Sequence, residues 1–221
     1  MTIHMANEVQ KLKSKLLFLC SLVEQSLWKA VKSLRERDSK LARQVIDEDV
    51  LIDQNEVDVE EECLKILALH QPVAVDLRFI ITALKINVDL ERIGDLSVNI
   101  AERSEFLARH EPAPIPFDFE TMARITQQML RDSLDALINM DCARAASVLK
   151  NDDTVDAINK EMYDQVKSAI LSHPEHVESL IHLLSVSRHL ERIADHAVNI
   201  AEEVIYMVEA RIIRHKAEDY Q

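Results

Sequence analysis

Glycine is almost missing from this sequence: one glycine and five prolines occur in 221 residues. Tight β-turns and two-residue hairpins depend on these residue types, so their scarcity argues strongly against a β-sheet protein. Leu, Ala, Glu, Lys, Arg and Ile dominate the chain, and these are good or acceptable helix formers. We therefore expect an all-α fold.

Cysteine motifs are missing as well. Cys20, Cys63 and Cys142 lie far apart, and no C-x-x-C spacing occurs. This pattern suggests neither a zinc–thiolate site nor a disulfide framework. Unpaired cysteines are among the residues most often buried, so we expect buried free thiols in a reducing compartment.

Long hydrophobic segments are absent. The most notable apolar run, LLFLCSL at residues 16–22, is far shorter than the roughly 20 residues that span a bilayer. The N-terminal stretch MTIHMANEVQKLKSK lacks the apolar core of a signal peptide. We therefore expect a cytoplasmic protein.

Positive charge is scarce: the formal net charge is −13, and acidic residues outnumber basic ones in both halves of the chain. Nucleic-acid-binding proteins need a basic face, so we expect no nucleic-acid partner. The acidity suits metal cations or a basic surface on a partner protein. Solubility alone would explain the net charge equally well.

Prolines mark the organisation of the chain. The segment HEPAPIPFD, residues 110–118, holds three alternating prolines, which cannot continue a helix. Pro72 and Pro174 each stand before a long helical pattern, and proline is favoured in the first turn of a helix. Periodicity predicts six helices, at about residues 7–35, 40–69, 72–109, 119–140, 143–171 and 174–214.

The two halves look like copies of one unit. LERIGDLSVNIAE begins at Leu90 and LERIADHAVNIAE begins at Leu190, and the copies differ only at 94/194, 96/196 and 97/197. Upstream, VIDEDVLIDQNE from Val45 aligns with VLKNDDTVDAIN from Val148. Short connections make neighbouring helices antiparallel, so we predict two tandem three-helix bundles related by internal duplication. The predicted parts are the first bundle (1–110), a proline-rich linker (111–117) and the second bundle (118–221).

Acidic residues of the repeated motif face away from its apolar seam. Residues advance about 100° around a helix, which places Glu91 and Asp95 within about 40° of each other. We therefore expect a stripe of exposed carboxylates outside the core. The seam lies nearly opposite, and consists of Ile86, Leu90, Ile93, Ser97 and Ile100 in the first half, and of Val186, Leu190, Ile193, Ala197 and Ile200 in the second.

The carboxylates form four i,i+4 pairs, one on the second and one on the third helix of each half. A single such pair would be read as solvated surface. Like charges at this spacing destabilise a helix by roughly 0.2–0.5 kcal/mol, so helix stability does not explain the repetition. Clustered carboxylates suit hard cations such as Fe(III), Mn(II), Mg(II) or Ca(II). The candidate ligands are Asp49, Asp53, Glu91 and Asp95 for one site, and Asp152, Asp156, Glu191 and Asp195 for a second.

The acidic stripe also allows functions other than metal binding. A ferritin-like di-iron oxidase needs inward-facing Glu-x-x-His motifs, and no histidine of this chain has a glutamate three residues before it. No catalytic triad, glycine-rich phosphate loop or zinc helix motif occurs, so we expect no enzyme, and a carboxylate metalloenzyme is the weakest alternative. A helical interaction scaffold, whose acidic stripe meets a basic partner without metal, is the stronger alternative.

Residues beside the stripe have structural interpretations. We expect His196 to be structural rather than a metal ligand. Arg92 and Arg192 are expected to pair with acids on the neighbouring helix. Gly94 lies mid-helix, where glycine is about 1 kcal/mol less favourable than alanine. Its counterpart Ala194 is also small, so both positions predict a close approach of two helices.

The segments QPVAVDLRFIITALKINVDLERIGDLSVNIAE and SRHLERIADHAVNIAEEV closely resemble the PhoU family of phosphate-transport accessory regulators. The length, the six helices and the repeat match along nearly the whole chain. The resemblance implies two similar three-helix bundles and metal ions bound through E/D-x-x-x-D motifs, here the eight carboxylates named above. It also implies a negative regulator of phosphate uptake, which acts with the phosphate ABC transporter and a membrane sensor kinase.

The same resemblance leads us to expect multinuclear Fe(III), with Mn, Mg, Ca or Zn as alternatives. We further expect a homodimer that associates with the membrane only peripherally, through its partners. Asn99, Glu102, Asn199 and Glu202 match flanking positions of the family pattern and receive no assigned role.

Overall fold

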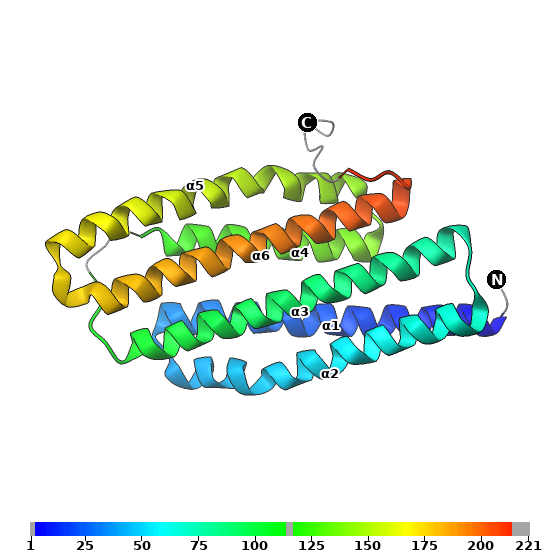
Figure 1. Cartoon of the computed structure of the whole chain (residues 1–221), viewed down its shortest axis with the longest axis horizontal. Helices are drawn as coiled ribbons and strands as arrows, with labels where there is room; N and C mark the ends of the chain where they lie inside the picture. Colours follow the sequence, from blue (N-terminus) through cyan, green and yellow to red (C-terminus); the bar gives the residue numbers. More distant parts are fainter. Residues whose placement is uncertain (1–2, 114–116, 214–221) are drawn as a thin grey trace.

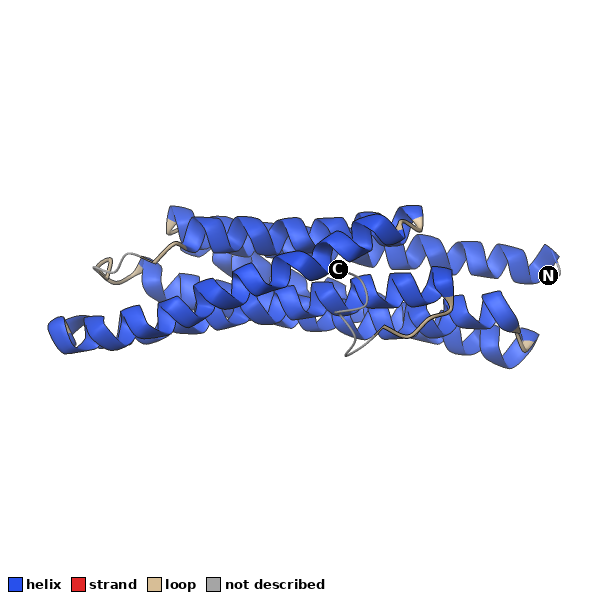
Figure 2. Ribbon diagram, turned by 90° about the horizontal axis from the view of Figure 1, so that it is seen from above, coloured by secondary structure: helices blue, strands red, loops and turns tan. Residues whose placement is uncertain are grey.

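The computed structural model describes residues 3–113 and 117–213, and all regular structure within these ranges is helical. Long helices run roughly along the long axis of an elongated molecule (Figure 1, Figure 2). In the described part of the chain, no helix combines the length and the apolar character needed to cross a membrane. The elements are α1 (Ile3–Glu36), α2 (Ser39–His70), α3 (Ala74–Ala108), α4 (Phe119–Asn139), α5 (Cys142–Ser172), the 3₁₀ turn η1 (Pro174–His176) and α6 (Val177–Glu209).

The two halves of the chain lie side by side, with α3 and α6 adjacent at the boundary between them (Figure 1). Helices α1, α2 and α3 pack against one another, and so do α4, α5 and α6. One apolar core contains residues from all six helices. The predicted all-α architecture is confirmed. The division into domains at 1–110 and 118–221 stays a prediction, and residues 114–116 of the predicted linker lie outside the described residues.

The predicted apolar seams form the centre of this core. Leu90, Ile93 and Ile100 of α3 have no exposed surface, and the same is true of their α6 counterparts Leu190 and Ile193. Fully burying a side chain of this size contributes about 1.5–3 kcal/mol relative to leaving it exposed. The seams therefore fix how α3 and α6 are rotated about their own axes, and this rotation decides where the acidic residues of each motif point.

Equivalent turns join the first two helices of each half. Arg37 and Met140 adopt left-handed backbone conformations with φ of 53° and 54°. Asp38 and Asp141 follow directly, and each accepts hydrogen bonds from backbone N–H groups in the first turn of the next helix. Such N-caps typically stabilise a helix by about 1 kcal/mol. The turns place α2 and α5 in register at an offset of 103 residues, as the alignment of the two acidic segments predicts.

Both motif-bearing helices begin later than predicted. Gln71 ends α2 in a left-handed conformation with φ of 44°, and Val73 is extended, so Pro72 lies in the connection rather than in α3. Pro174 starts a single 3₁₀ turn, and α6 follows it. In both places the missing N–H of proline is tolerated outside the regular α-helical hydrogen bonds.

The end of α6 also differs from the prediction. Ala210 adopts a left-handed conformation with φ of 58°, and its N–H donates to the carbonyl oxygen of Tyr206 at 2.9 Å. This cap ends α6 at Glu209, so the predicted continuation toward residue 214 is wrong. Residue 214 itself lies outside the described part of the chain.

The cysteines largely follow expectation. Cys20 and Cys63 are buried free thiols, whereas Cys142 is only half buried. Burial raises the pKa of Cys20 and of Cys63 to about 12. A thiol with so high a pKa is not a reactive thiolate near neutral pH, so these two residues serve packing.

Gly94 marks the closest contact of α2 with α3. A methyl group at this position would lie 3.1 Å from Ile52 Cγ2 and 3.2 Å from Ile52 Cδ1. The second half holds Ala194 and Val155 at the equivalent buried positions. From the first half to the second, the residue on the second helix loses one carbon (Ile52 to Val155) and the residue on the third helix gains one (Gly94 to Ala194). The total number of side-chain carbons at the contact therefore stays the same. The predicted close helix approach is therefore confirmed.

We expect the effect of Gly94→Ala on stability to depend on residue 52. In an Ile52→Val background, alanine should raise the free energy of unfolding by about 1 kcal/mol, because it restores helix propensity without crowding. In the wild-type background the gain should be smaller, because the new methyl group presses on Ile52. Urea unfolding of the four proteins in this double-mutant cycle measures both values. Equal gains in the two backgrounds would show that close packing does not explain the glycine.

Candidate metal centres

The first group of acids lies where α2 meets α3. Asp49 and Asp53 come from α2, and Glu91 and Asp95 come from α3. A methyl group at Gly94 would lie 3.5 Å from Asp49 Oδ1, so this oxygen sits against the α3 backbone between Glu91 and Asp95. Burial, and then the charges of Asp53, Asp95 and Glu91, raise the pKa of Asp49 to about 6. The structure therefore brings the four predicted residues of the first site together.

The second group repeats this arrangement between α5 and α6. Burial, and then the charges of Asp156 and Asp195, raise the pKa of Asp152 to about 6. Burial, and then the charges of Glu191 and Asp156, likewise raise the pKa of Asp195. The four predicted residues of the second site therefore influence one another as the first four do.

One carboxylate oxygen in each group is buried without a hydrogen-bond partner. These atoms are Asp49 Oδ1 and Asp152 Oδ1, which occupy equivalent positions in the two halves. An unpaired buried polar group typically costs about 1–3 kcal/mol, and more if it is charged. The same unpaired oxygen therefore recurs at equivalent positions of the two halves.

The expectation of a fully exposed acidic stripe is wrong, because the carboxylates that lie nearest the neighbouring helix, here called the inner acids, are partly buried. Asp53, Asp156 and Asp195 are exposed, as predicted. The small buried residues Gly94 and Ala194 lie among the acids of α3 and α6, and at Gly94 the neighbouring helix comes close enough to cover Asp49. The inner acids are Asp49, Glu91, Asp95, Asp152 and Glu191.

The arginines beside the stripe do not pair as predicted. Arg92 contacts Glu91 at 3.3 Å and Asp95 at 3.1 Å, both on its own helix rather than on α2. Its side chain lies on the outer surface, where acids one and three positions away are the nearest partners. Arg192 makes no hydrogen bond or ion pair with any other described residue, so the expected neighbour-helix pair is absent there too.

His196 has a structural partner that sequence reasoning missed. Its Nδ1 lies 2.8 Å from Asp89 Oδ1, and Asn199 donates to the same oxygen at 3.2 Å. Asp89 belongs to α3, so this contact joins the two halves and supports the structural interpretation of His196. The internal repeat does not predict this contact, because the counterpart of Asp89 in the second half is His189 rather than an acid. In the first motif, Asn99 instead donates to the carbonyl oxygen of Asp95 at 2.9 Å.

The acidic side chains supply the oxygen donors that a hard cation prefers, but those that the structure describes do not form a complete coordination site. Within the described residues, no three Asp, Glu, His or Cys side chains are arranged to hold a metal ion. The oxygen donors, their mutual repulsion and the two unpaired buried oxygens nevertheless match what Mn(II), Mg(II) or Fe(III) requires. Binding would require side-chain rotation in both groups, and in the first it would require Arg92 to release Glu91 and Asp95.

Known proteins resemble the chain in both halves. The family model of the PhoU domain matches residues 16–104 and again residues 119–204. The chain belongs to the PhoU family. The resemblance inferred from the two motifs is thereby confirmed, and the two matches agree with the internal duplication.

Relatives within the PhoU family match over almost the full chain. The phosphate-specific transport system accessory protein PhoU homolog of Aquifex aeolicus is 38% identical over 209 residues, which cover 95% of each chain. The accessory protein PhoU of Serratia marcescens is 32% identical, covering 96% of this chain and 87% of its own. The crystal structure of PhoU from Pseudomonas aeruginosa superimposes with a TM-score of 0.91 at 37% identity, covering 93% of this chain and 99% of that one.

Replacing Asp49 and Asp152, which hold equivalent positions on α2 and α5, should weaken metal binding in both groups. We expect Asp49→Asn with Asp152→Asn to weaken Mn(II) binding at least tenfold, because changes even to outer-shell partners of a metal commonly cost about 10–100-fold. Elemental analysis after dialysis and thermal unfolding with added Mn(II) provide the readouts. Asp47→Asn is the matched control, because this exposed residue of α2 lies outside the group. Wild-type metal content in the double variant would contradict the assignment.

Asp49 also predicts a pH dependence of the metal-free protein. Its pKa is about 6 in the folded state against an ordinary 3.8, so the folded state binds the proton more tightly than the unfolded chain. The stability that this carboxyl contributes is full below pH 3.8 and is lost as the pH rises through about 6. With a chelator present, the free energy of unfolding of the wild type should therefore fall relative to Asp49→Asn between about pH 4 and 7. A difference that does not vary with pH would refute this.

Proposed function

We propose that this protein is a regulatory accessory protein of a phosphate-specific transport system. The observation that carries the proposal is the extent of the match: relatives with that name align with 94–96% of this chain. A shared fold alone would say little, since unrelated functions often use one fold. Here matches at 32–38% identity cover nearly the whole chain, and therefore both halves.

The finer role that we propose is negative regulation. In this proposal the protein restrains phosphate uptake and the phosphate-starvation response, as an adaptor between the phosphate ABC transporter and a membrane sensor kinase. It would act from the cytoplasm as a homodimer and reach the membrane through these partners. We propose no catalysis, because the relatives carry names of accessory proteins rather than enzymes.

Metal binding forms part of the proposed role. A cation bound by acids of both α2 and α3 would hold these two helices together. A second cation would do the same for α5 and α6. The cation would offset the repulsion that contributes to the raised pKa values of Asp49 and Asp152. We propose multinuclear Fe(III) as the bound form, with Mn, Mg, Ca or Zn as alternatives. The competing proposal is a helical scaffold in which the same acids meet a basic partner without metal.

Deletion of the gene should leave the phosphate-starvation response switched on in phosphate-rich medium. The reason is that a negative regulator is lost while the transporter and kinase remain. A reporter driven by a starvation-inducible promoter measures the effect, and the wild-type gene on a plasmid should restore repression. An unchanged reporter in the deletion strain would remove the regulatory proposal.

The same strain separates the metal proposal from the scaffold proposal. If metal is required, the Asp49→Asn, Asp152→Asn double variant should fail to restore repression, although it folds and accumulates normally. Restoration by this variant together with loss of bound metal would favour the scaffold. The Asp47→Asn control should restore repression in either case.

A further inference from the structure

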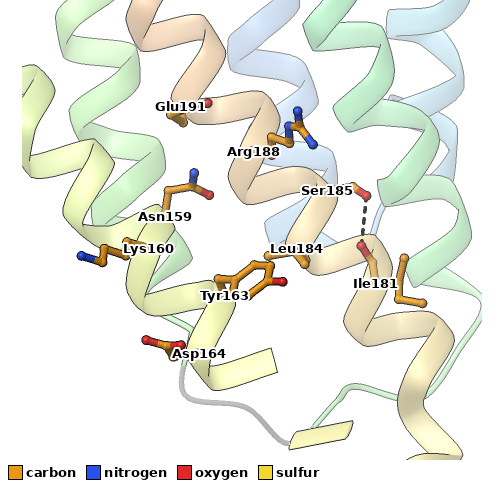
Figure 3. Close-up of a pocket in the computed structure, with 9 residues that line it drawn as sticks. All are labelled: Asn159, Lys160, Tyr163, Asp164, Ile181, Leu184, Ser185, Arg188 and Glu191. Carbon is orange, nitrogen blue, oxygen red and sulfur yellow. Dashed lines mark hydrogen bonds between the residues drawn. The ribbon is translucent and has the colours of Figure 1, made fainter. Parts of the chain in front are cut away.

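A cavity of about 570 Å³ lies between α5 and α6, beside the second acidic group (Figure 3). Its size falls in the range of ordinary small-molecule sites, roughly 300–1,000 Å³. Tyr163 lies between the two helices, and Ile181 and Leu184 of α6 supply further apolar lining. Lys160 on the α5 side and Arg188 on the α6 side are the two cations of the lining.

The first half shows that the fold does not need these residues. At the equivalent positions α2 has Val57 and Glu60 in place of Lys160 and Tyr163, and α3 has Val88 in place of Arg188. A hydrogen bond between the two helices, made one residue before the aligned positions, occurs in both halves and supports this alignment of the copies. Asn87 donates to Glu56 Oε1 at 2.8 Å in the first half, and Ser187 donates to Asn159 Oδ1 at 2.8 Å in the second. The copies thus share their packing but differ in the chemistry of this surface.

The differing residues are available to a ligand. Within the described residues Lys160 and Arg188 make no side-chain hydrogen bond or ion pair. Arg188 is nevertheless close enough to act on Glu191: burial raises the pKa of that carboxyl, and the charge of Arg188 partly offsets the rise. Tyr163 is 62% exposed and Ile181 is 53% exposed, so the cavity is open to solvent at both residues. Figure 3 shows the Lys160 amine and the Arg188 guanidinium pointing away from each other, so both side chains must turn toward the ring to contact one ligand. An aromatic ring with one cation on each helix favours a ligand that is planar in one part and anionic in another.

We propose that the cavity between α5 and α6 binds a nucleotide, with the base stacked on Tyr163 and the phosphates held by Lys160 and Arg188. Stacking of a base on an aromatic side chain tolerates any base, and it supplies much of the affinity of such sites. The carboxylates of Asp164 and Glu191 also line the cavity and can accept hydrogen bonds from ribose hydroxyls or base amino groups. Inorganic phosphate alone would leave most of the volume empty and the apolar wall uncovered.

The acidic residues beside the cavity affect how a nucleotide phosphate can bind. Glu191 belongs both to the cavity lining and to the second candidate metal group, so a bare phosphate chain would meet negative charge there. Divalent cations accompany nucleotide phosphates, and they reduce this repulsion. We therefore expect binding to be tighter with Mg(II) than with a chelator. This inference concerns a different ligand from the proposed regulation, and it can fail while the deletion phenotype holds.

Titration of a fluorescent ADP analogue into the full chain, in the presence of Mg(II), tests the proposal. We expect one saturable site per chain, displaced by unlabelled ADP but only weakly by inorganic phosphate or by adenosine. Absence of saturable binding would overturn the proposal. Displacement by inorganic phosphate as effective as that by ADP would overturn the nucleotide assignment and leave a simple anion site.

Substitutions of the lining residues locate the site, and the first of them introduces the valines that the first half carries at these positions. Lys160→Val with Arg188→Val should weaken binding at least tenfold, because both anion contacts are lost. Tyr163→Leu should weaken it about tenfold, whereas Tyr163→Phe should bind as the wild type does, because stacking needs the ring alone. Lys167→Val is the matched control, since this exposed lysine of α5 does not line the cavity. Wild-type affinity in the Lys160→Val, Arg188→Val protein, with unchanged thermal unfolding, would refute the placement.

Discussion

The apolar seams of α3 and α6 are the constraint on which the rest of the molecule depends. Leu90, Ile93 and Ile100 are fully buried, and so are their counterparts in the second half. Burial on this scale outweighs any surface contact, because exposed ion pairs contribute only about 0–1 kcal/mol each. The seams thus set the rotation of both helices. With that rotation set, the acids of each motif turn toward the second helix of their own half.

This arrangement carries an electrostatic penalty that the chain does not remove by itself. Asp49 and Asp152 each retain a buried oxygen without a hydrogen-bond partner. Burial and then the neighbouring carboxylates raise the pKa of both residues. The packing around them has varied between the copies, as Gly94 and Ala194 show, whereas the aspartates have not. Packing alone would accept an uncharged residue at the same place, so the constancy of the acids is compatible with the proposed cation sites.

The two halves share one core but present different surfaces. The acidic groups recur in both, while Lys160, Tyr163 and Arg188 occur only in the second. Polar contacts also tie the halves to each other: Lys85 contacts Glu203 at 3.1 Å, and Asp89 contacts His196 at 2.8 Å. Both contacts join α3 to α6, and the Asp89–His196 contact lies close to both acidic groups, since the charge of His196 acts on Glu91 and on Asp195. A ligand that shifts one of these helices would therefore act on residues of the other half.

The sequence by itself determined the helical class, the duplication, the seams and the grouping of the acids, because helical periodicity is a local property that can be counted along the chain. It misplaced the starts of α3 and α6, where turn conformations at Gln71 and around Pro174 override the pattern. Only the tertiary structure decided that Asp49 is partly buried, that Arg92 pairs within its own helix, and that a cavity opens beside Tyr163. Each of these depends on which side chains meet across a helix–helix contact. That pairing follows from the distance and angle between two helices, which the periodicity of either helix does not contain.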